Sequence, residues 1–281
     1  MADGILFIDK EAGMTSRKLD NQIGKLFHTH KVGHLGTLDP FATGLLIVGV
    51  NSGNKALRFA LDEEKEYVAT LNLGVATSTG DYTGQQTEHE EIPLLPKNQV
   101  SSVVKGLVGK MKQIPPMTSA IKVGGVALYR LAHEGKEIQR EAREIEVKEA
   151  KLLSYGGDEL TFQVLVSKGT YIRTLGEDLA KRLGTVGHLT ALRRTAIGPF
   201  RVENAVKLED IGEESLQNPL VLLDHMEQHE CQGKELFKVA NGASLDLPCV
   251  SPIVLLTHEN QALAVYERKQ GDHYICLRGL A

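Results

Sequence analysis

One short segment, residues 33–44, places a histidine, a carboxylate and three glycines within twelve residues, GHLGTLDPFATG. Pro40 lacks an N–H and fixes its own φ, and it pushes the preceding Asp39 out of the helical region. The glycines allow tight backbone paths and the close approach of a ligand. The segment is therefore predicted to be an extended or turned loop that holds one carboxylate out into a cleft. An ordinary Asp-Pro turn between two strands is the alternative.

A carboxylate presented in this way has two chemical uses. It can attack a substrate covalently, or it can stabilise positive charge that develops on the substrate. If it must stay ionised in a dry pocket, it needs a cation nearby. The segment 167–175, SKGTYIRTL, offers Arg173, whose guanidinium can clamp a carboxylate through two hydrogen bonds. A contact between Arg173 and a phosphate group is the alternative.

Both segments resemble the TruB-type tRNA pseudouridine-55 synthases, whose catalytic loop is usually written GHxGxLDPxATG. The resemblance is dense over residues 4–201 and loose beyond them. It implies an isomerase, an intramolecular transferase, that converts uridine 55 in the TΨC loop of tRNA to pseudouridine. It also implies base flipping, an aspartate nucleophile and assistance to tRNA folding. Further segments match the family in order, at residues 65–67, 77–84, 113–122, 128–130 and 192–194.

The resemblance implies three catalytic residues. It assigns the nucleophile to Asp39 and its orienting cation to Arg173. It places Tyr67 against the flipped base, where the ring can stack and the phenol can take part in proton transfer. Tyr67 therefore counts as both catalytic and substrate-binding. Without the resemblance, a tyrosine in an alternating strand is read as part of the core.

Five other residues are predicted to bind substrate, the first three of them from the resemblance: His34, Tyr171, Leu192, Asp81 and Lys122. In the family, the position of His34 contacts RNA in the T-loop region, and Tyr171 and Leu192 match positions that line the base pocket. Asp81 lies in a Gly/Thr-rich turn, so its carboxylate could contact substrate or simply hold the turn. Lys122 could contact a phosphate or cap the core with its charge.

The implied reaction breaks a C–N glycosidic bond and forms a C–C bond to the same sugar, with no redox change. It therefore demands no cofactor. His28, His30 and His34 have no standard zinc spacing, and no cysteine or carboxylate completes the set, so no metal is expected. An odd number of cysteines without paired spacing predicts buried free thiols, at Cys231, Cys249 and Cys276.

Charge is distributed unevenly along the 281 residues. The net charge is −4, yet residues 101–201 hold 17 Lys or Arg against 10 Asp or Glu. A nucleic-acid interface needs such local positive potential, although a solvated surface of mixed charge is the alternative. No apolar run is long enough for a membrane span, and the N-terminus lacks the features of a signal peptide. We therefore expect no membrane contact and a cytoplasmic location.

Apolar patterning predicts the elements that must position these residues. Residues 85–99 are polar and acidic and contain two prolines, so they are predicted to form a loop. Strands and helices do not alternate regularly, which favours the α+β class with a mixed, largely antiparallel sheet flanked by helices; the resemblance implies the pseudouridine synthase fold. The pattern predicts strands at 4–9, 45–50, 67–73, 145–154 and 160–167, and helices from Thr15 or Ser16 to 27 and at 55–61, 100–108, 126–133 and 172–183.

Two domains are predicted, a catalytic domain over 1–215 and a small β-rich domain over 220–281. Acidic residues and the turn signal Asn218-Pro219 mark the border. Short strands are expected at 253–256, 263–266 and 274–277. The resemblance implies a PUA-like RNA-binding domain here, and a plain β-rich extension is the alternative.

The resemblance implies tRNA as the partner, bound through its T arm without a guide RNA, and nothing in the sequence requires more than a monomer. Two rival functions remain open. One is an RNA chaperone that helps tRNA fold, with catalysis secondary. The other is a guide-dependent catalytic subunit, as in the archaeal and eukaryotic relatives.

Overall fold

The computed structural model describes residues 2–61, 64–119, 121–128, 131, 135–136 and 138–280, without the side chains of 122, 123, 126 and 127. The chain divides into two compact units. The first unit comprises Met1–Pro40, Leu45–Asp62 and Asn204–Ala281, and the second comprises Phe41–Gly44 and Glu63–Glu203. None of the helices in the described part of the chain has the length and apolar character needed to cross a membrane.

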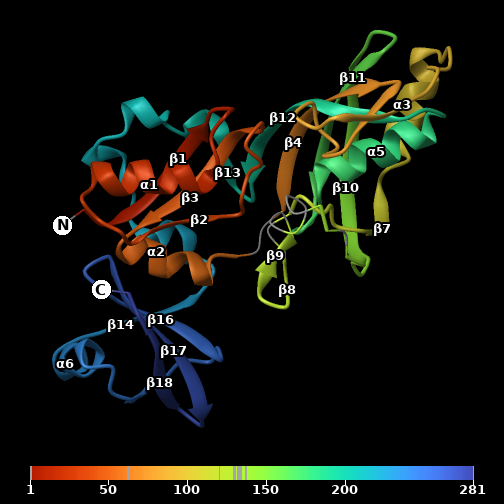
Figure 1. Cartoon of the computed structure of the whole chain (residues 1–281). Coiled ribbons are helices and arrows are strands. Elements are labelled where there is room, and N and C mark those ends of the chain that lie inside the picture. The colour runs from red at the N-terminus through yellow and green to blue at the C-terminus, as the bar shows by residue number, and fades with distance from the viewer. Residues whose placement is uncertain are drawn as a thin grey trace. The chain divides into compact units, whose positions relative to one another are not determined.

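The N-terminal part of the first unit is a small sheet covered by one long helix (Figure 1). The helix α1 spans Ser16–Leu26, and the side chain of Thr15 caps it by accepting the N–H of Lys18. Leu19 and Ile23 of α1 are buried in one core cluster with residues of the strands. The predicted strand at 4–9 and the predicted helix from residue 15 or 16 are confirmed. The strands are β1 Gly4–Lys10, β2 Val32–Leu35 and β3 Thr43–Val50.

The helix expected at 55–61 lies further toward the N-terminus and is shorter. Residues Ser52–Ala56 form α2, and Leu57–Phe59 continue as the 3-10 helix η1. The sequence did not predict that the helix begins at Ser52, because Gly53 follows and glycine disfavours helix interiors. Gly53 is nevertheless required there, since an added Cβ would come within 2.6 Å of the carbonyl carbon of Gly4.

The second unit is built on an antiparallel sheet with the strand order β12-β4-β11-β10-β7. Thr43 and Gly44, at the start of β3, add a parallel pairing with Arg193 and Arg194 of β12. This arrangement confirms the mixed, largely antiparallel sheet of an α+β protein. The strands are β4 Lys65–Leu73, β7 Gly109–Gln113, β10 Arg143–Tyr155, β11 Glu159–Val166 and β12 Gly187–Ile197, and the two-residue strand β13 Phe200–Arg201 pairs with β12.

Helix α5, Ile172–Arg182, lies against this sheet (Figure 1). Its buried residues Leu175 and Leu179 follow the helical period and face the strands. Both the predicted helix at 172–183 and the predicted pair of strands before it are confirmed. The turn between β10 and β11 contains Gly156 and Gly157, where it was expected.

The prediction of a loop over 85–99 is wrong at both ends. Residues Gln86–His89 form β6, which pairs with β5 (Val75–Thr77), and Lys97–Lys105 form α3. All four residues of β6 are exposed, so the strand has no buried face and shows no alternating pattern. Helix α3 begins directly after Pro96, where proline sets a favourable φ, and the helix expected at 100–108 is therefore shifted.

The prediction of a helix over 126–133 is also wrong at its start. Val126–Ala127 form β9, which pairs with β8 (Lys122–Val123). The turn between them is Gly124-Gly125, and both residues have positive φ. Two glycines at a tight turn favour a hairpin over a helix. Residues 129, 130, 132 and 133 of the expected helix lie outside the described residues.

The C-terminal part of the first unit is a five-stranded sheet with the order β14-β16-β17-β18-β15. Its own core cluster includes Cys231, Tyr266 and Tyr274. The three strands expected near the C-terminus are confirmed, whereas the domain border between 215 and 220 stays a prediction. The elements are β14 Glu227–Glu230, α6 Lys234–Ala240, β15 Leu245–Asp246, β16 Ile253–His258, β17 Gln261–Gln270 and β18 His273–Gly279, preceded by the 3-10 helices η2 Val202–Asn204, η3 Leu208–Asp210, η4 Glu213–Ser215 and η5 Pro219–Leu222.

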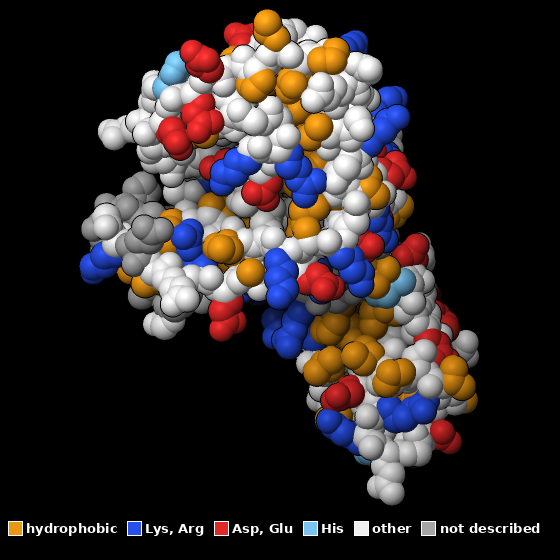
Figure 2. All heavy atoms as spheres, turned by 90° about the vertical axis from the view of Figure 1, so that its right-hand side faces the viewer, with side chains coloured by type: hydrophobic (Ala, Val, Ile, Leu, Met, Phe, Trp, Pro, Cys, Tyr) orange, Lys and Arg blue, Asp and Glu red, His pale blue; other side chains and the backbone are white. Residues whose placement is uncertain are grey.

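The surface carries both signs of charge. On the face shown in Figure 2, Lys and Arg side chains stand next to Asp and Glu side chains, with apolar patches between them. No large single-sign field covers the described residues of this face, so the local excess of basic residues in the sequence does not translate into one continuous basic surface here.

Candidate functional site

The loop that carries Asp39 connects β2 to β3, which pair antiparallel. Helix α1 holds this loop through Ser16. The Ser16 hydroxyl donates to the carbonyl oxygen of Leu38 (3.1 Å) and accepts the Leu38 N–H (3.0 Å). Ser16 is buried, with 1% of its surface exposed, so both backbone groups of the residue before Asp39 are satisfied in the interior.

The residue after Asp39 is held as well. The carbonyl oxygen of Pro40 accepts the Gly13 N–H at 2.8 Å and lies 3.4 Å from Nζ of Lys10. Asp39 itself is half-buried. The carboxylate therefore stands on a backbone segment that is fixed on both sides, as a preorganised catalytic group requires.

His34 is oriented through both ring nitrogens. Its Nδ1 lies 2.8 Å from Oδ2 of Asp20, and its Nε2 lies 3.1 Å from the hydroxyl of Thr37. Only 2% of the Asp20 side chain is exposed. The ring thus connects α1 to the loop of Asp39, because Thr37 belongs to that loop.

Arg173 lies in the first turn of α5, and 3% of its side chain is exposed. Its Nη1 donates to the carbonyl oxygen of Thr79 (2.7 Å) and to the hydroxyl of Thr118, and its Nη2 donates to the carbonyl oxygen of Thr118 (3.0 Å). Nη1 also lies 3.8 Å from Oδ2 of Asp81. The structure therefore brings together two predicted site residues, Arg173 and Asp81.

Asp81 is 5% exposed and holds the turn in which it lies. Its Oδ1 accepts the Thr83 N–H at 3.0 Å and the hydroxyls of Thr79 and Thr83. The side chain thus forms the turn contacts of the alternative interpretation while its second oxygen faces Arg173. Asp81 therefore helps to hold Arg173 in position, through the turn and through its second carboxylate oxygen.

Tyr171 is the residue before α5, and Gln113 at the end of β7 fixes its backbone. The Tyr171 N–H donates to Oε1 of Gln113 (2.8 Å), and Nε2 of Gln113 donates to the Tyr171 carbonyl oxygen (3.1 Å). Gln113 is 3% exposed. This two-bond clamp joins the start of α5 to the sheet.

Tyr67 and Leu192 lie on one face of the sheet. Tyr67 of β4 pairs with Arg194 of β12, and Leu192 of β12 pairs with Ala69 of β4. Paired residues share a face, and residues two apart on one strand share it too. Tyr67 and Leu192 are both buried, at 7% and 5%, and are therefore diagonal neighbours on that face.

The predicted site residues fall into two groups. His34 and Asp39 belong to the first unit, and the others belong to the second unit. For Lys122 the structure places the backbone, in β8, and the side chain lies outside what is described. Among the described residues, one group of potential metal ligands lies close together, and it includes neither His28 nor His30.

Sequence reasoning missed the supporting residues Asp20, Gln113 and Thr118. Gln113 and Thr118 belong to a segment that matches the family, but no role was assigned to them. Asp20 had a signal, because it is a carboxylate on the buried side of an amphipathic helix, and such a group needs a partner.

Family models and curated proteins that match this chain show its relatives. The family model described as TruB family pseudouridylate synthase (N terminal domain) matches residues 24–172, and the one described as tRNA pseudouridylate synthase B C-terminal domain matches residues 173–226. The chain is 40% identical to a protein of Geotalea uraniireducens (strain Rf4) named tRNA pseudouridine synthase B, over 92% of this chain and 86% of that protein. A protein of the same name from Geobacter sulfurreducens is 45% identical over 75% of this chain and 69% of its own length.

The fold has solved relatives as well. A chain in the crystal structure of a Cbf5-Nop10-Gar1 complex superposes with a TM-score of 0.70 at 24% identity, covering 96% of this chain and 79% of that one. At this identity the likeness concerns the fold alone. The two family models together match residues 24–226, which carry the candidate site residues, and the chain belongs to the TruB family of pseudouridylate synthases.

Proposed function

We propose that this protein is an isomerase that converts a uridine of tRNA to pseudouridine. The observation that carries the proposal is the half-buried Asp39 on a loop fixed from both sides, in a chain whose relatives are named tRNA pseudouridine synthase B. The isomerisation breaks the bond between C1′ and N1 of the uridine and forms one between C1′ and C5. The proton on C5 is lost and N1 gains one, so atoms and electrons balance without a cofactor.

Asp39 acts as the nucleophile in this proposal. Its carboxylate attacks C6 of the base or C1′ of the sugar, or it stabilises a glycal-like sugar while the base turns. Arg173 serves as the cation that keeps the carboxylate ionised and oriented. The contacts of Arg173 with Thr79, Thr118 and Asp81 support this role, because a guanidinium that donates three hydrogen bonds and lies beside a carboxylate has little freedom to swing away.

The base pocket is assigned to the sheet face that carries Tyr67 and Leu192. An uridine extruded from folded RNA needs a ring to stack on and apolar walls. Tyr67 supplies the ring and a phenol for proton transfer, and Leu192 supplies a wall beside it. Tyr171 lines the same pocket from the start of α5, where Gln113 fixes its backbone.

We further propose uridine 55 in the T arm as the target, reached by the protein as a monomer without a guide RNA. His34 contacts the T loop, and Lys122 contacts a phosphate. Residues 1–215 form the catalytic domain, and residues 220–281 form a PUA-like RNA-binding domain. The separate core cluster of the C-terminal sheet supports this division, since a domain needs its own core.

Tritium release from C5-labelled uridine in an unmodified tRNA transcript tests the proposal. The wild-type protein alone is expected to release tritium, and Asp39→Asn is expected to release none while still binding tRNA. Equal release by both proteins would contradict the role of Asp39. Absence of release by both, with tight tRNA binding, would favour an RNA chaperone or a missing guide partner. Transcripts with the T-loop uridine replaced by cytidine test the position.

A further inference from the structure

A second surface lies in the first unit, on the side of α1 that leads into β2. Here a groove of about 670 Å³ runs along α1 and the turn after it. Arg17 and Lys25 of α1 line the groove together with His28 and His30 of the turn. All four side chains are exposed. None of the roles proposed above uses these residues.

Two permanent cations, Arg17 and Lys25, line the groove in a chain whose net charge is negative. Among the described residues no carboxylate forms an ion pair with Lys25, His28 or His30, and the carboxylate nearest to Arg17 is Asp20, at 3.7 Å. Cations on a concave surface raise the local concentration of anions. The ligand of this groove is therefore expected to be an anion.

The spacing of the cations indicates an extended anion. Arg17 and Lys25 are eight residues apart on one helix, which places their backbones about 12 Å apart along its axis. One phosphate group cannot contact both without drawing the side chains together. A strand of RNA presents a phosphate at every nucleotide, so it can engage both ends of the groove at once.

One carboxylate, Asp20, connects the groove to the support of His34. Asp20 lines the groove, and its Oδ2 holds His34. Its Oδ1 is buried and has no hydrogen-bond partner within the described part of the chain. Because Oδ1 is enclosed by protein, a ligand in the groove contacts the cations and not this oxygen.

We propose that this groove binds the sugar-phosphate backbone of the substrate RNA outside the flipped nucleotide. Arg17 and Lys25 contact phosphates of one strand, and His28 and His30 line the groove beside them. Asp20 belongs both to the groove and to the support of His34, so backbone binding occurs directly beside the loop of Asp39. This inference rests on the proposed function only in taking RNA as the substrate.

The test compares Arg17→Gln/Lys25→Gln with Lys18→Gln, a change to another exposed lysine of α1 that does not line the groove. The equilibrium constant for binding a T-arm stem-loop RNA is measured over a series of salt concentrations. Loss of two phosphate contacts is expected to weaken binding about tenfold and to lower the slope of log K against log salt by about 1 to 2. Lys18→Gln is expected to behave as the wild type does.

Kinetics separate the groove from the catalytic step. The double variant should raise KM in proportion to the weaker binding, because its contacts lie outside the reacting nucleotide. The inference is overturned if the double variant keeps the affinity and salt slope of Lys18→Gln, or if kcat alone falls. A wild-type protein that binds this RNA without forming pseudouridine would refute the proposed function, and the binding comparison would still decide the role of the groove.

Discussion

Oδ2 of Asp81 lies 3.8 Å from Nη1 of Arg173, and the two side chains are only 6% and 3% exposed. A charge pair enclosed to this degree is sensitive to the loss of one member, because the remaining charge stays buried. Asp81 also accepts hydrogen bonds from Thr79 and Thr83. It therefore supports Arg173 directly, through charge, and indirectly, through the turn whose Thr79 carbonyl accepts from Arg173.

The first prediction concerns this pair. Asp81→Asn keeps a side-chain oxygen for the turn and removes the charge, so we expect a folded protein whose kcat is lowered about tenfold or more, which corresponds to about 1.4 kcal/mol of lost transition-state stabilisation. Single-turnover kinetics with saturating tRNA measure this effect. Asp81→Ala should in addition lower the free energy of unfolding by about 3 kcal/mol. Wild-type kcat in Asp81→Asn would show that the charge of Asp81 is irrelevant to Arg173.

The second prediction concerns Ser16, which satisfies both backbone groups of Leu38 beside Asp39. Ser16→Ala leaves a buried N–H and a buried carbonyl oxygen without this partner, at a cost of about 1–3 kcal/mol. We expect kcat to fall while the affinity for tRNA is retained, because the loop loses its fixed position.

Thr15→Ala is the matched control for Ser16→Ala. It removes the cap of the same helix, at a cost of about 1 kcal/mol, without touching the loop. Thermal unfolding and kcat are measured for both variants. If the two lower kcat equally at similar stability, Ser16 acts through α1 and not through the position of Asp39.

Much of this architecture could be predicted from the pattern of apolar residues. Helix α5 has buried residues at helical spacing, and β4 alternates buried and half-buried residues along its length. Strand β12, which carries Leu192, was not predicted. Its charged residues Arg193 and Arg194 interrupt the apolar pattern that would have indicated a strand. Arg194 is nevertheless 1% exposed, and tertiary contacts decide that burial.

The candidate site shows the same division between local and long-range information. The loop of Asp39 could be predicted because proline and glycine act on neighbouring residues. The clamp between Gln113 and Tyr171 joins residues 58 positions apart, and the contact of Asp20 with His34 depends on how α1 packs. Local propensity holds no information about such pairs, and only the folded chain brings them together.

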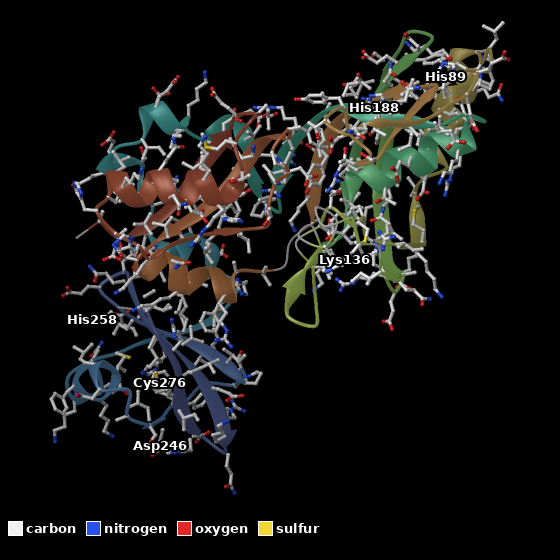
Figure 3. The ribbon with its side chains drawn as sticks, in the orientation of Figure 1. His89, Lys136, His188, Asp246, His258 and Cys276 are labelled. Atoms are coloured by element: carbon white, nitrogen blue, oxygen red, sulfur yellow. The ribbon has the colours of Figure 1, made fainter. Side chains whose placement is uncertain are left out.

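The third prediction concerns the cysteines, of which Cys231 and Cys249 are buried and Cys276 is half-buried on β18 (Figure 3). Burial raises the pKa of Cys231 from its ordinary value of 9.0 to about 11, and it raises the pKa of Cys249 as well. Thiolates react and thiols do not. We therefore expect an alkylating reagent at neutral pH to modify Cys276 first, and the other two only after unfolding. Mass spectrometry of native and denatured samples measures the order, and early modification of Cys231 would contradict it.

The fourth prediction concerns alkaline pH and follows from the same thiol. Well below pH 9.0 Cys231 is protonated in the folded and the unfolded chain. Between pH 9.0 and about 11 the unfolded chain loses this proton while the folded chain keeps it. Ionisation of Cys231 therefore lowers the free energy of unfolding as the pH rises through this range. Urea unfolding over this range should show a steeper loss of stability in the wild type than in Cys231→Ser. Parallel curves for the two proteins would mean that the thiol does not titrate as inferred.

The fifth prediction concerns Gly44, the last residue of the Asp39 segment, which pairs with Arg194. Gly44 has a φ of +103°, and an added Cβ would lie 2.7 Å from the Arg194 nitrogen and still closer to its carbonyl oxygen. Backbone strain costs about 1–3 kcal/mol, and the clash adds to it, so Gly44→Ala should lower Tm by roughly 5–10 °C. Gly157→Ala, at a φ of +83° with nothing within 4 Å, isolates the strain. Strand β12 also carries Leu192. Gly44→Ala should therefore slow pseudouridine formation more than Gly157→Ala does, at a temperature where both variants are folded. Equal rates would show that the pairing of β3 with β12 does not position the pocket.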